Sequence, residues 1–159
     1  MQNWLHTRTE SKERRMTEHI ESLKRLHTIL IDSKHGYEDA LADAEGHGMT
    51  QVFRDMIALR IKDGGEIATE LATLGEKADD KGSFMTTVNR AIISLRSLFG
   101  GLDESILPGL IDAEKRIVSN YDSALESAAS TVDREILTRQ RQNLLKIIAD
   151  MESKNALAA

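Results

Sequence analysis

A run of apolar side chains spaced three or four residues apart, in the first third of the chain, is the feature that most constrains its fold. Only His27 and Lys34 interrupt the run. Because side chains at this spacing share one face of an α-helix, the run predicts a long amphipathic helix from about Thr17 to Glu45. Its members are Met16, Ile20, Leu23, Leu30, Tyr37, Leu41 and Ala44.

A later segment repeats the end of this run. The sequence YEDALADA at 37–44 returns as YDSALESAA at 121–129. The repeat is short and consists of common helix formers, so it indicates either an internal duplication or chance. A duplication predicts two helical hairpins related by a pseudo-twofold axis.

Glycine and proline mark the ends of the remaining helices. The glycines at 46–48 end the first helix, since glycine adopts left-handed backbone at no steric cost. A second helix opens at Thr50 and closes at Gly75, and the short link makes it an antiparallel neighbour of the first. Gly64 and Gly65 inside this helix indicate a close approach of another helix, a local kink, or simple tolerance.

Three further helices follow the second one. Ser83 caps a short third helix that ends at glycines 100 and 101. The fourth begins at Ser105 or Asp103 and carries Pro108 in its first turn, where no amide hydrogen is needed. The fifth starts after a break near Ser130. With no segment of strand alternation, the sequence predicts an all-α, ferritin-like four-helix bundle of two antiparallel hairpins joined by a shorter crossover helix.

Length and composition restrict the possible functions. The 159 residues suit one domain, which we place at 17–159, with 1–16 as a loosely attached polar extension. Trp4 and Leu5 in the extension offer contacts for the bundle or a neighbouring subunit. The absence of Cys excludes thiolate chemistry. No signal-peptide core and no apolar run near 18 residues is present, so we expect a cytoplasmic protein without a membrane partner.

Charge argues against a nucleic-acid partner. The formal net charge is −5, which repels nucleic acid and anionic lipid. The basic cluster at 12–15 is flanked by Glu10 and Glu18 and needs no partner as a solvated helix surface. Nucleophile and phosphate-loop motifs are also absent, because the glycine-containing segments at 75–83 and 101–109 lack the strand and lysine context of a phosphate loop. We therefore expect no enzyme activity.

The histidines do not match a carboxylate-bridged di-metal centre. Such centres draw Glu-x-x-His pairs from two helices of a bundle, and this chain contains no Glu-x-x-His. Its five histidines all precede the second helix. His27 lies on the apolar face and is expected in the core, whereas His19, His35 and His47 are expected to face solvent.

Three charged residues lie on or beside the predicted core faces. Glu38, Arg60 and Glu114 each adjoin apolar positions of the first, second and fourth helices. Counted from the first turn, Glu38 and Arg60 differ by roughly 4 to 5 Å in height. We therefore predict that Arg60 neutralises Glu38, with Glu114 as a further partner, in place of a metal ion. The alternative is that Arg60 lays its stem on the core and its head in water.

Several segments, in their order along the chain, resemble a bacterial ferritin-like helical-bundle family, domain of unknown function 2383. The similar segments are LIDSKHGYEDA at 30–40, the stretch 60–66 followed by LATLG at 71–75, KGS at 81–83, NRAIISL at 89–95 and AEKRIVSNYDSAL at 113–125. The resemblance implies a ferritin-like bundle with stress-associated roles. It also implies acidic positions at Glu38, Glu66 and Glu114.

The chain departs from the family pattern where metal ligands are expected. The resemblance implies a Glu before the helix-two Arg, a His before Arg90, a further acidic residue in helix four and a His near the chain end. These positions hold Leu59, Asn89, Ile111 and Ala149. We therefore expect no cofactor and no intact di-iron centre.

Two functions follow as expectations. The first is a non-enzymatic structural or interaction protein of a bacterial cytoplasm, acting as a homo-oligomer or an adaptor. The second is a degenerate ferritin-like protein that binds iron or manganese through Glu38, Glu66 and Glu114.

Overall fold

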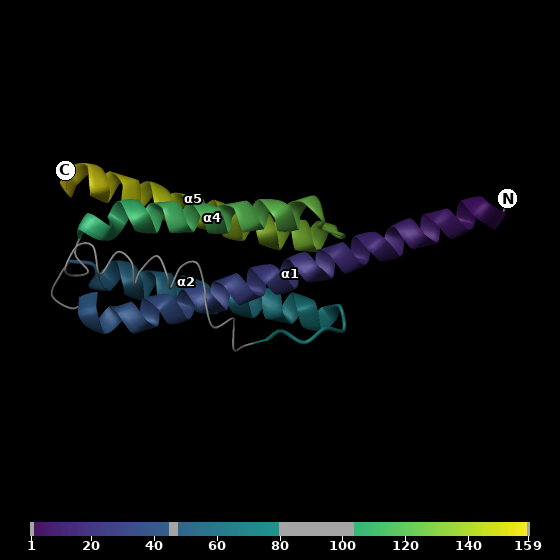
Figure 1. The fold of residues 1–159 in the computed structure, drawn as a ribbon, viewed down its shortest axis with the longest axis horizontal. Coiled ribbons are helices and arrows are strands. Elements are labelled where there is room, and N and C mark those ends of the chain that lie inside the picture. Colours follow the sequence, from purple (N-terminus) through teal and green to yellow (C-terminus); the bar gives the residue numbers. More distant parts are fainter. Residues whose placement is uncertain (1, 45–47, 80–103, 159) are drawn as a thin grey trace.

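The computed structural model describes residues 2–44, 48–79 and 104–158, and these segments are α-helical apart from their turns (Figure 1). No strand occurs within them, which confirms the all-α class. The elements are α1 (Gln2–Ala44), α2 (Thr50–Thr73), the short 3-10 helix η1 (Glu104–Ile106), α4 (Leu107–Glu126) and α5 (Thr131–Ala158).

Helix α1 is longer than the sequence analysis predicts. It begins at Gln2 and runs for 43 residues, so the segment expected as a loose extension is helical and continuous with the first helix. Neither Gly nor Pro occurs before Gly36, and a helix already formed in the bundle extends at little cost through such a sequence. Residues 3–15 are all exposed, and this end of α1 projects past the other helices (Figure 1).

Helix α2 follows the predicted boundaries. Its C-terminal turn closes through Gly75, which has a φ of +79°, and the amide of Glu76 donates to the carbonyl of Leu71 over 2.9 Å. This is the glycine-dependent end predicted for the second helix. Within α2, a Cβ on Gly64 would lie 3.6 Å from Ile31 Cδ1, whereas Gly65 faces open space. A Cβ at Gly64 would thus make an ordinary van der Waals contact with α1, so a close approach of another helix explains neither glycine.

The ends of α4 and α5 also match the predicted signals. Pro108 occupies the first turn of α4. Ser130 precedes α5, where its hydroxyl oxygen accepts from the amide of Asp133 over 3.1 Å and donates to Asp133 Oδ2 over 2.7 Å. The first of these bonds satisfies an amide that the start of a helix leaves without a partner.

The hairpin of α1 and α2 packs against the hairpin of α4 and α5 (Figure 1). The repeated segment holds equivalent places in the two hairpins, because Tyr37 and Ala40 of α1 and Tyr121 and Ala124 of α4 are all fully buried. The predicted crossover at 83–99, and with it the ferritin-like connection, lies outside the described residues. None of the described helices is long and apolar enough to cross a membrane.

Candidate functional site

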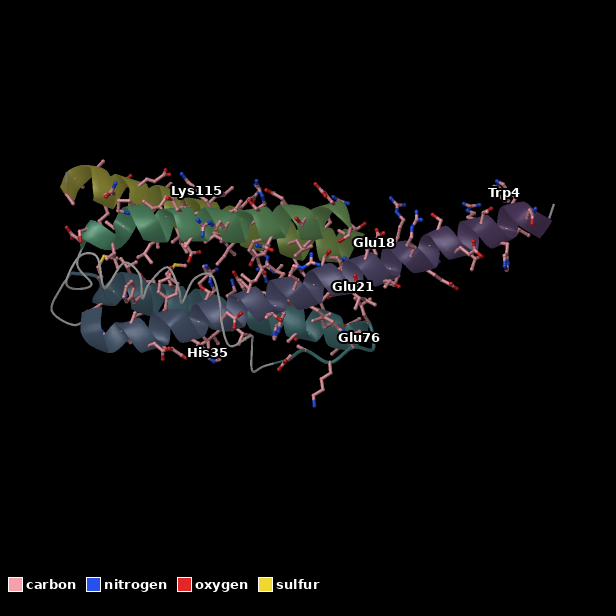
Figure 2. The ribbon with its side chains drawn as sticks, viewed as in Figure 1. Trp4, Glu18, Glu21, His35, Glu76 and Lys115 are labelled. Atoms are coloured by element: carbon pink, nitrogen blue, oxygen red, sulfur yellow. The ribbon has the colours of Figure 1, made fainter. Side chains whose placement is uncertain are left out.

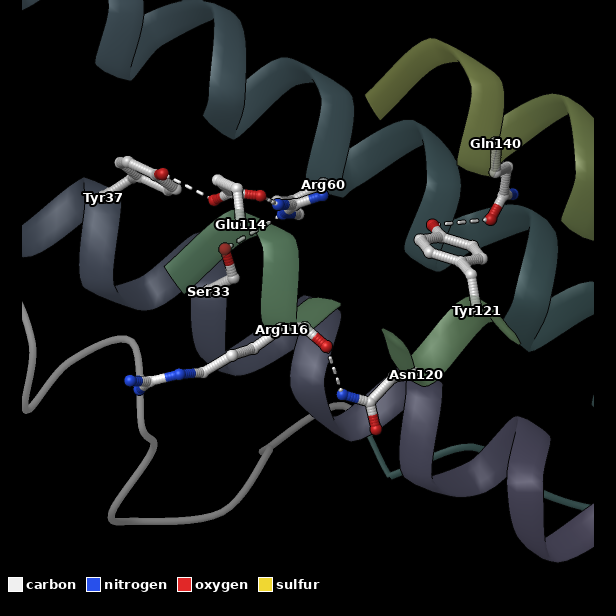
Figure 3. A network of polar contacts seen from close by, with 8 residues as sticks. All are labelled: Ser33, Tyr37, Arg60, Glu114, Arg116, Asn120, Tyr121 and Gln140. Atoms are coloured by element: carbon white, nitrogen blue, oxygen red, sulfur yellow. Dashed lines mark hydrogen bonds and ion pairs between the residues drawn. The ribbon is translucent and has the colours of Figure 1, made fainter. Parts of the chain in front are cut away.

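Arg60 lies at the centre of the bundle. It follows Met56 and precedes Ile67 on the buried face of α2, and it is the largest side chain in the described core that is fully buried. Its Nη2 forms an ion pair with Glu114 Oε2 of α4, and its Nε donates to Ser33 Oγ of α1 over 2.9 Å (Figure 3). One guanidinium therefore connects three helices.

Tyr37 completes the surroundings of Glu114. Its hydroxyl donates to Glu114 Oε1 over 2.6 Å, so both carboxylate oxygens have a donor (Figure 3). Burial raises the pKa of Tyr37 well above its ordinary value, and the adjacent charge of Glu114 raises it further. Burial lowers the pKa of Arg60, but the attraction and hydrogen bond of Glu114, together with the two tyrosines Tyr37 and Tyr121, raise the arginine pKa overall. We call Ser33, Tyr37, Arg60 and Glu114 the buried ion-pair centre.

A second polar group lies farther along the bundle. The Tyr121 hydroxyl donates to Gln140 Oε1 over 3.0 Å, and Gln140 Nε2 donates to the backbone carbonyl of Asp63 over 3.3 Å. The Asp63 carboxylate itself is buried and has no hydrogen-bond partner among the described residues. Burial raises the pKa of this carboxyl to about 6, although the nearby positive charge of Arg60 acts in the opposite direction. Asp63 is thus a buried acid that titrates close to neutral pH.

The predicted ion pair between Glu38 and Arg60 is absent from the structure. Glu38 is exposed and lies 3.9 Å from Lys34 of its own helix, whereas Arg60 binds Glu114, the further partner that the sequence predicted. Each residue of an α-helix is rotated by about 100° from the one before it, so Glu38 points away from the core that its neighbour Tyr37 enters. The prediction compared the heights of Glu38 and Arg60 without this rotation.

The three acidic positions implied by the resemblance have different cationic partners. Glu114 binds Arg60 in the core, and Glu38 lies near Lys34 on the surface. Glu66 accepts from Arg139 Nη1 of α5 over 3.2 Å, and this hydrogen bond lowers the pKa of Glu66. Within the described segments, no group of three or more His, Asp or Glu side chains is placed to hold a metal ion.

His19 also departs from its predicted place. It is fully buried, with Nε2 3.0 Å from Asp133 Oδ2 of α5, instead of facing solvent. The two atoms are within ion-pair distance. His19 shares a helical face with Leu26, Ser33 and Ala40 at intervals of seven residues, which turns it into the bundle.

The other predicted histidines divide between core and surface. His27 is buried in the core, and His35 is partly buried instead of fully solvated. His47 lies outside the residues that the structure describes.

Asp63 and Gln140 were missed by the sequence analysis, although both lie on apolar faces at helical spacing. Asp63 is four residues before Ile67, and Gln140 lies between Leu137 and Leu144. A polar residue at such a position is a candidate for the core. The signal was present for both, but the sequence does not indicate which partner each one finds.

The fold and the buried centre define a class: all-α helical bundles whose two hairpins are joined by an internal arginine–glutamate pair. Within this class, the chain belongs to the family described as Domain of unknown function (DUF2383), whose model matches residues 18–127. All four residues of the buried ion-pair centre lie in the matched region. Searches of curated proteins and of solved structures found no match.

Proposed function

We propose that this protein is a non-enzymatic structural or interaction protein that acts by self-association through the exposed end of α1. The buried ion-pair centre supports a structural role, because Arg60 and Tyr37 already occupy both oxygens of Glu114. The same occupancy weakens the alternative of an iron or manganese site at Glu38, Glu66 and Glu114. Elemental analysis of protein purified without a chelating tag tests that alternative, and stoichiometric metal would favour it.

The observation that carries the proposal is the projecting end of α1. Residues 3–15 form a helix without a tertiary partner in the described structure, and Trp4 and Leu5 there are 63% and 62% exposed. The Arg8 guanidinium lies 5.2 Å from the centroid of the Trp4 ring. Tryptophan and arginine are enriched where proteins bind one another. Figure 2 shows Trp4 near the far end of this helix.

The cellular setting belongs to the same proposal. The family resemblance supports a bacterial cytoplasm and a role under stress conditions. Neither bears on the mechanism, which depends on the surface of α1.

Light scattering tests the proposal directly. The full chain and a variant lacking residues 2–15 are compared over a range of concentrations. We expect a multiple of the monomer mass for the full chain and the monomer mass for the truncated one. Far-ultraviolet circular dichroism controls for loss of the bundle. A full chain that stays monomeric at every concentration would exclude self-association.

A further inference from the structure

We propose that two copies of this chain form a twofold dimer in which their α1 helices pack antiparallel, crossing near Met16 and Thr17. Each basic α1 end then lies in the acidic groove of the other copy. This inference rests on the proposed self-association and specifies its surface and register. The second copy is the occupant that charge, geometry and the continuous helix favour together.

The groove lies between α1 and α4 and has a volume of about 470 Å³. Three carboxylates and one guanidinium line it, from Glu18, Glu21, Glu126 and Arg25, and the remaining lining residues are serines. Figure 2 shows Glu18 and Glu21 on α1 where the helix leaves the bundle. The groove therefore presents a net negative surface next to the projecting helix.

The projecting helix has the opposite charge. Residues 2–15 contain four Arg or Lys and two Glu side chains, which gives a formal charge of +2. Since the whole chain has a net charge of −5, the rest of the chain carries −7. A basic helix end and an acidic groove on the same molecule cannot meet within one copy, because α1 is continuous through both. Between two copies related by a twofold axis, they meet twice.

One face of α1 fixes the register. Starting at the groove and moving toward the N-terminus in steps of three and four, the face contains Arg25, Ser22, Glu18, Arg15, Ser11, Arg8 and Trp4. In an antiparallel pair with Ser11 opposite Ser22 of the other copy, Arg15 lies opposite Glu18. Arg14, beside this face, then flanks Glu21 of the other copy.

One contact in this register joins like charges. Arg8 comes opposite Arg25 of the other copy. Glu126 of α4 lines the groove beside Arg25, so a carboxylate is available to both guanidinium groups. The centre of the crossing, at Met16 and Thr17, contains no charge. The register therefore pairs opposite charges on both sides of an uncharged centre.

Exchange of the charges at positions 15 and 18 tests the register of the two α1 helices. Arg15→Glu and Glu18→Arg each place like charges opposite one another twice in the dimer, and we expect each to raise the dimer dissociation constant by at least about tenfold. The double variant restores opposite charges, and its dimer dissociation constant is expected to lie within about threefold of that of the original chain. Arg116→Glu, at an exposed position of α4 outside the groove, is the matched control. Failure of the double variant to recover would overturn the register.

Cross-linking provides an independent measurement, because the chain has no cysteine of its own. The double variant Ser11→Cys with Ser22→Cys is expected to form a disulfide-linked dimer on mild oxidation. Neither single variant should do so, since like positions are displaced by about 16 Å along the antiparallel helices. The same displacement prevents a bond within one chain. A dimer cross-linked by Ser11→Cys alone would indicate parallel packing and overturn the inference.

These measurements separate the two proposals. Light scattering that shows an assembly, with neither cross-linking nor charge recovery, overturns the register while self-association through α1 stands. A monomer at every concentration overturns both. All variants except Ser22→Cys change exposed side chains, and circular dichroism before oxidation checks that each has folded.

Discussion

Arg60 of α2 and Glu114 of α4 form an ion pair in which both side chains are fully removed from solvent. Transfer of two charges out of water is costly, and the hydrogen bonds with Ser33 and Tyr37 reduce that cost, whereas Arg60 Nη1 has no partner among the described residues. A guanidinium suits this place, since its planar fork donates to partners on two different helices at once. The pair thus fixes how one hairpin sits against the other.

Removal of one partner is expected to be severe. Arg60→Met leaves the Glu114 charge buried and should lower the free energy of unfolding by about 3 to 5 kcal/mol, measured by urea denaturation. The double variant Arg60→Met with Glu114→Leu removes both charges and should recover most of the loss. An Arg60→Met variant close to the original stability would contradict the buried pair.

Arg139 is the matched control for Arg60. Its pair with Glu66 joins α5 to α2 in the same way, but both side chains are partly exposed. Arg139→Met should therefore lower the unfolding free energy by only about 0 to 1 kcal/mol. Equal losses in the two variants would show that burial is not what makes the Arg60 pair important.

The two repeated tyrosines allow a comparison within one molecule. Tyr37→Phe removes a hydrogen bond to a charged carboxylate and should cost about 1.5 to 3 kcal/mol, whereas Tyr121→Phe removes one to a neutral amide and should cost about 0.5 to 1.5 kcal/mol. Thermal or urea unfolding of both variants measures the difference. The reverse order would argue against the ionised state of Glu114.

Asp63 is expected to make stability depend on pH. Its pKa rises from an ordinary 3.8 to about 6 in the folded protein, so the folded state holds this proton more tightly than the unfolded state. The contribution to the unfolding free energy is therefore full below about pH 4 and is lost as the pH rises through 6, by up to about 3 kcal/mol.

Asp63→Asn isolates this effect from the other carboxyl groups. The variant lacks the titration, so its stability relative to the original chain should increase between pH 4.5 and pH 7. Glu66, whose pKa is lowered, acts in the opposite direction in both proteins, so the subtraction removes the part of its contribution that does not depend on the charge of Asp63. A difference that does not change with pH would show that Asp63 keeps an ordinary pKa.

Two exposed glycines should respond to alanine with opposite signs. Gly65 faces open space inside α2, so Gly65→Ala should raise the unfolding free energy by roughly 1 kcal/mol through helix propensity. Gly75 has a φ of +79° at the end of α2, so Gly75→Ala should lower the unfolding free energy by about 1 kcal/mol. Stabilisation by both substitutions would contradict the left-handed turn at Gly75.

The sequence was sufficient to predict the all-α class, most helix ends and Glu114 as a partner of Arg60, but not the start of α1 or the other polar contacts in the core. The caps at Ser130 and Gly75 are local signals, because they act within a few residues of the backbone they satisfy. The repeat at Tyr37 and Tyr121 likewise predicted two equivalent buried positions. These properties depend only on local capping signals and on helical periodicity.

Which partner a polar side chain finds in the core depends on its rotational position about the helix axis and on how segments distant in the sequence pack together. Glu38 and Glu114 were both candidates for Arg60, and only their orientation on α1 and α4 separates them. His19 was placed on the surface because it lies beside one apolar line, although it belongs to a second line with Leu26 and Ala40. Spacing indicates which face a residue occupies, whereas its partner depends on how the helices pack.

The continuity of α1 has a consequence for how its projecting end becomes ordered. Starting a helix is the unfavourable step, whereas adding a residue to an existing one is nearly neutral. The packed part of α1 provides the nucleus, so residues 3–15 need only propagate from it. A weak contact near Trp4 is then enough to change how many turns stay formed, and the amides of this end should report such a contact through slower hydrogen exchange.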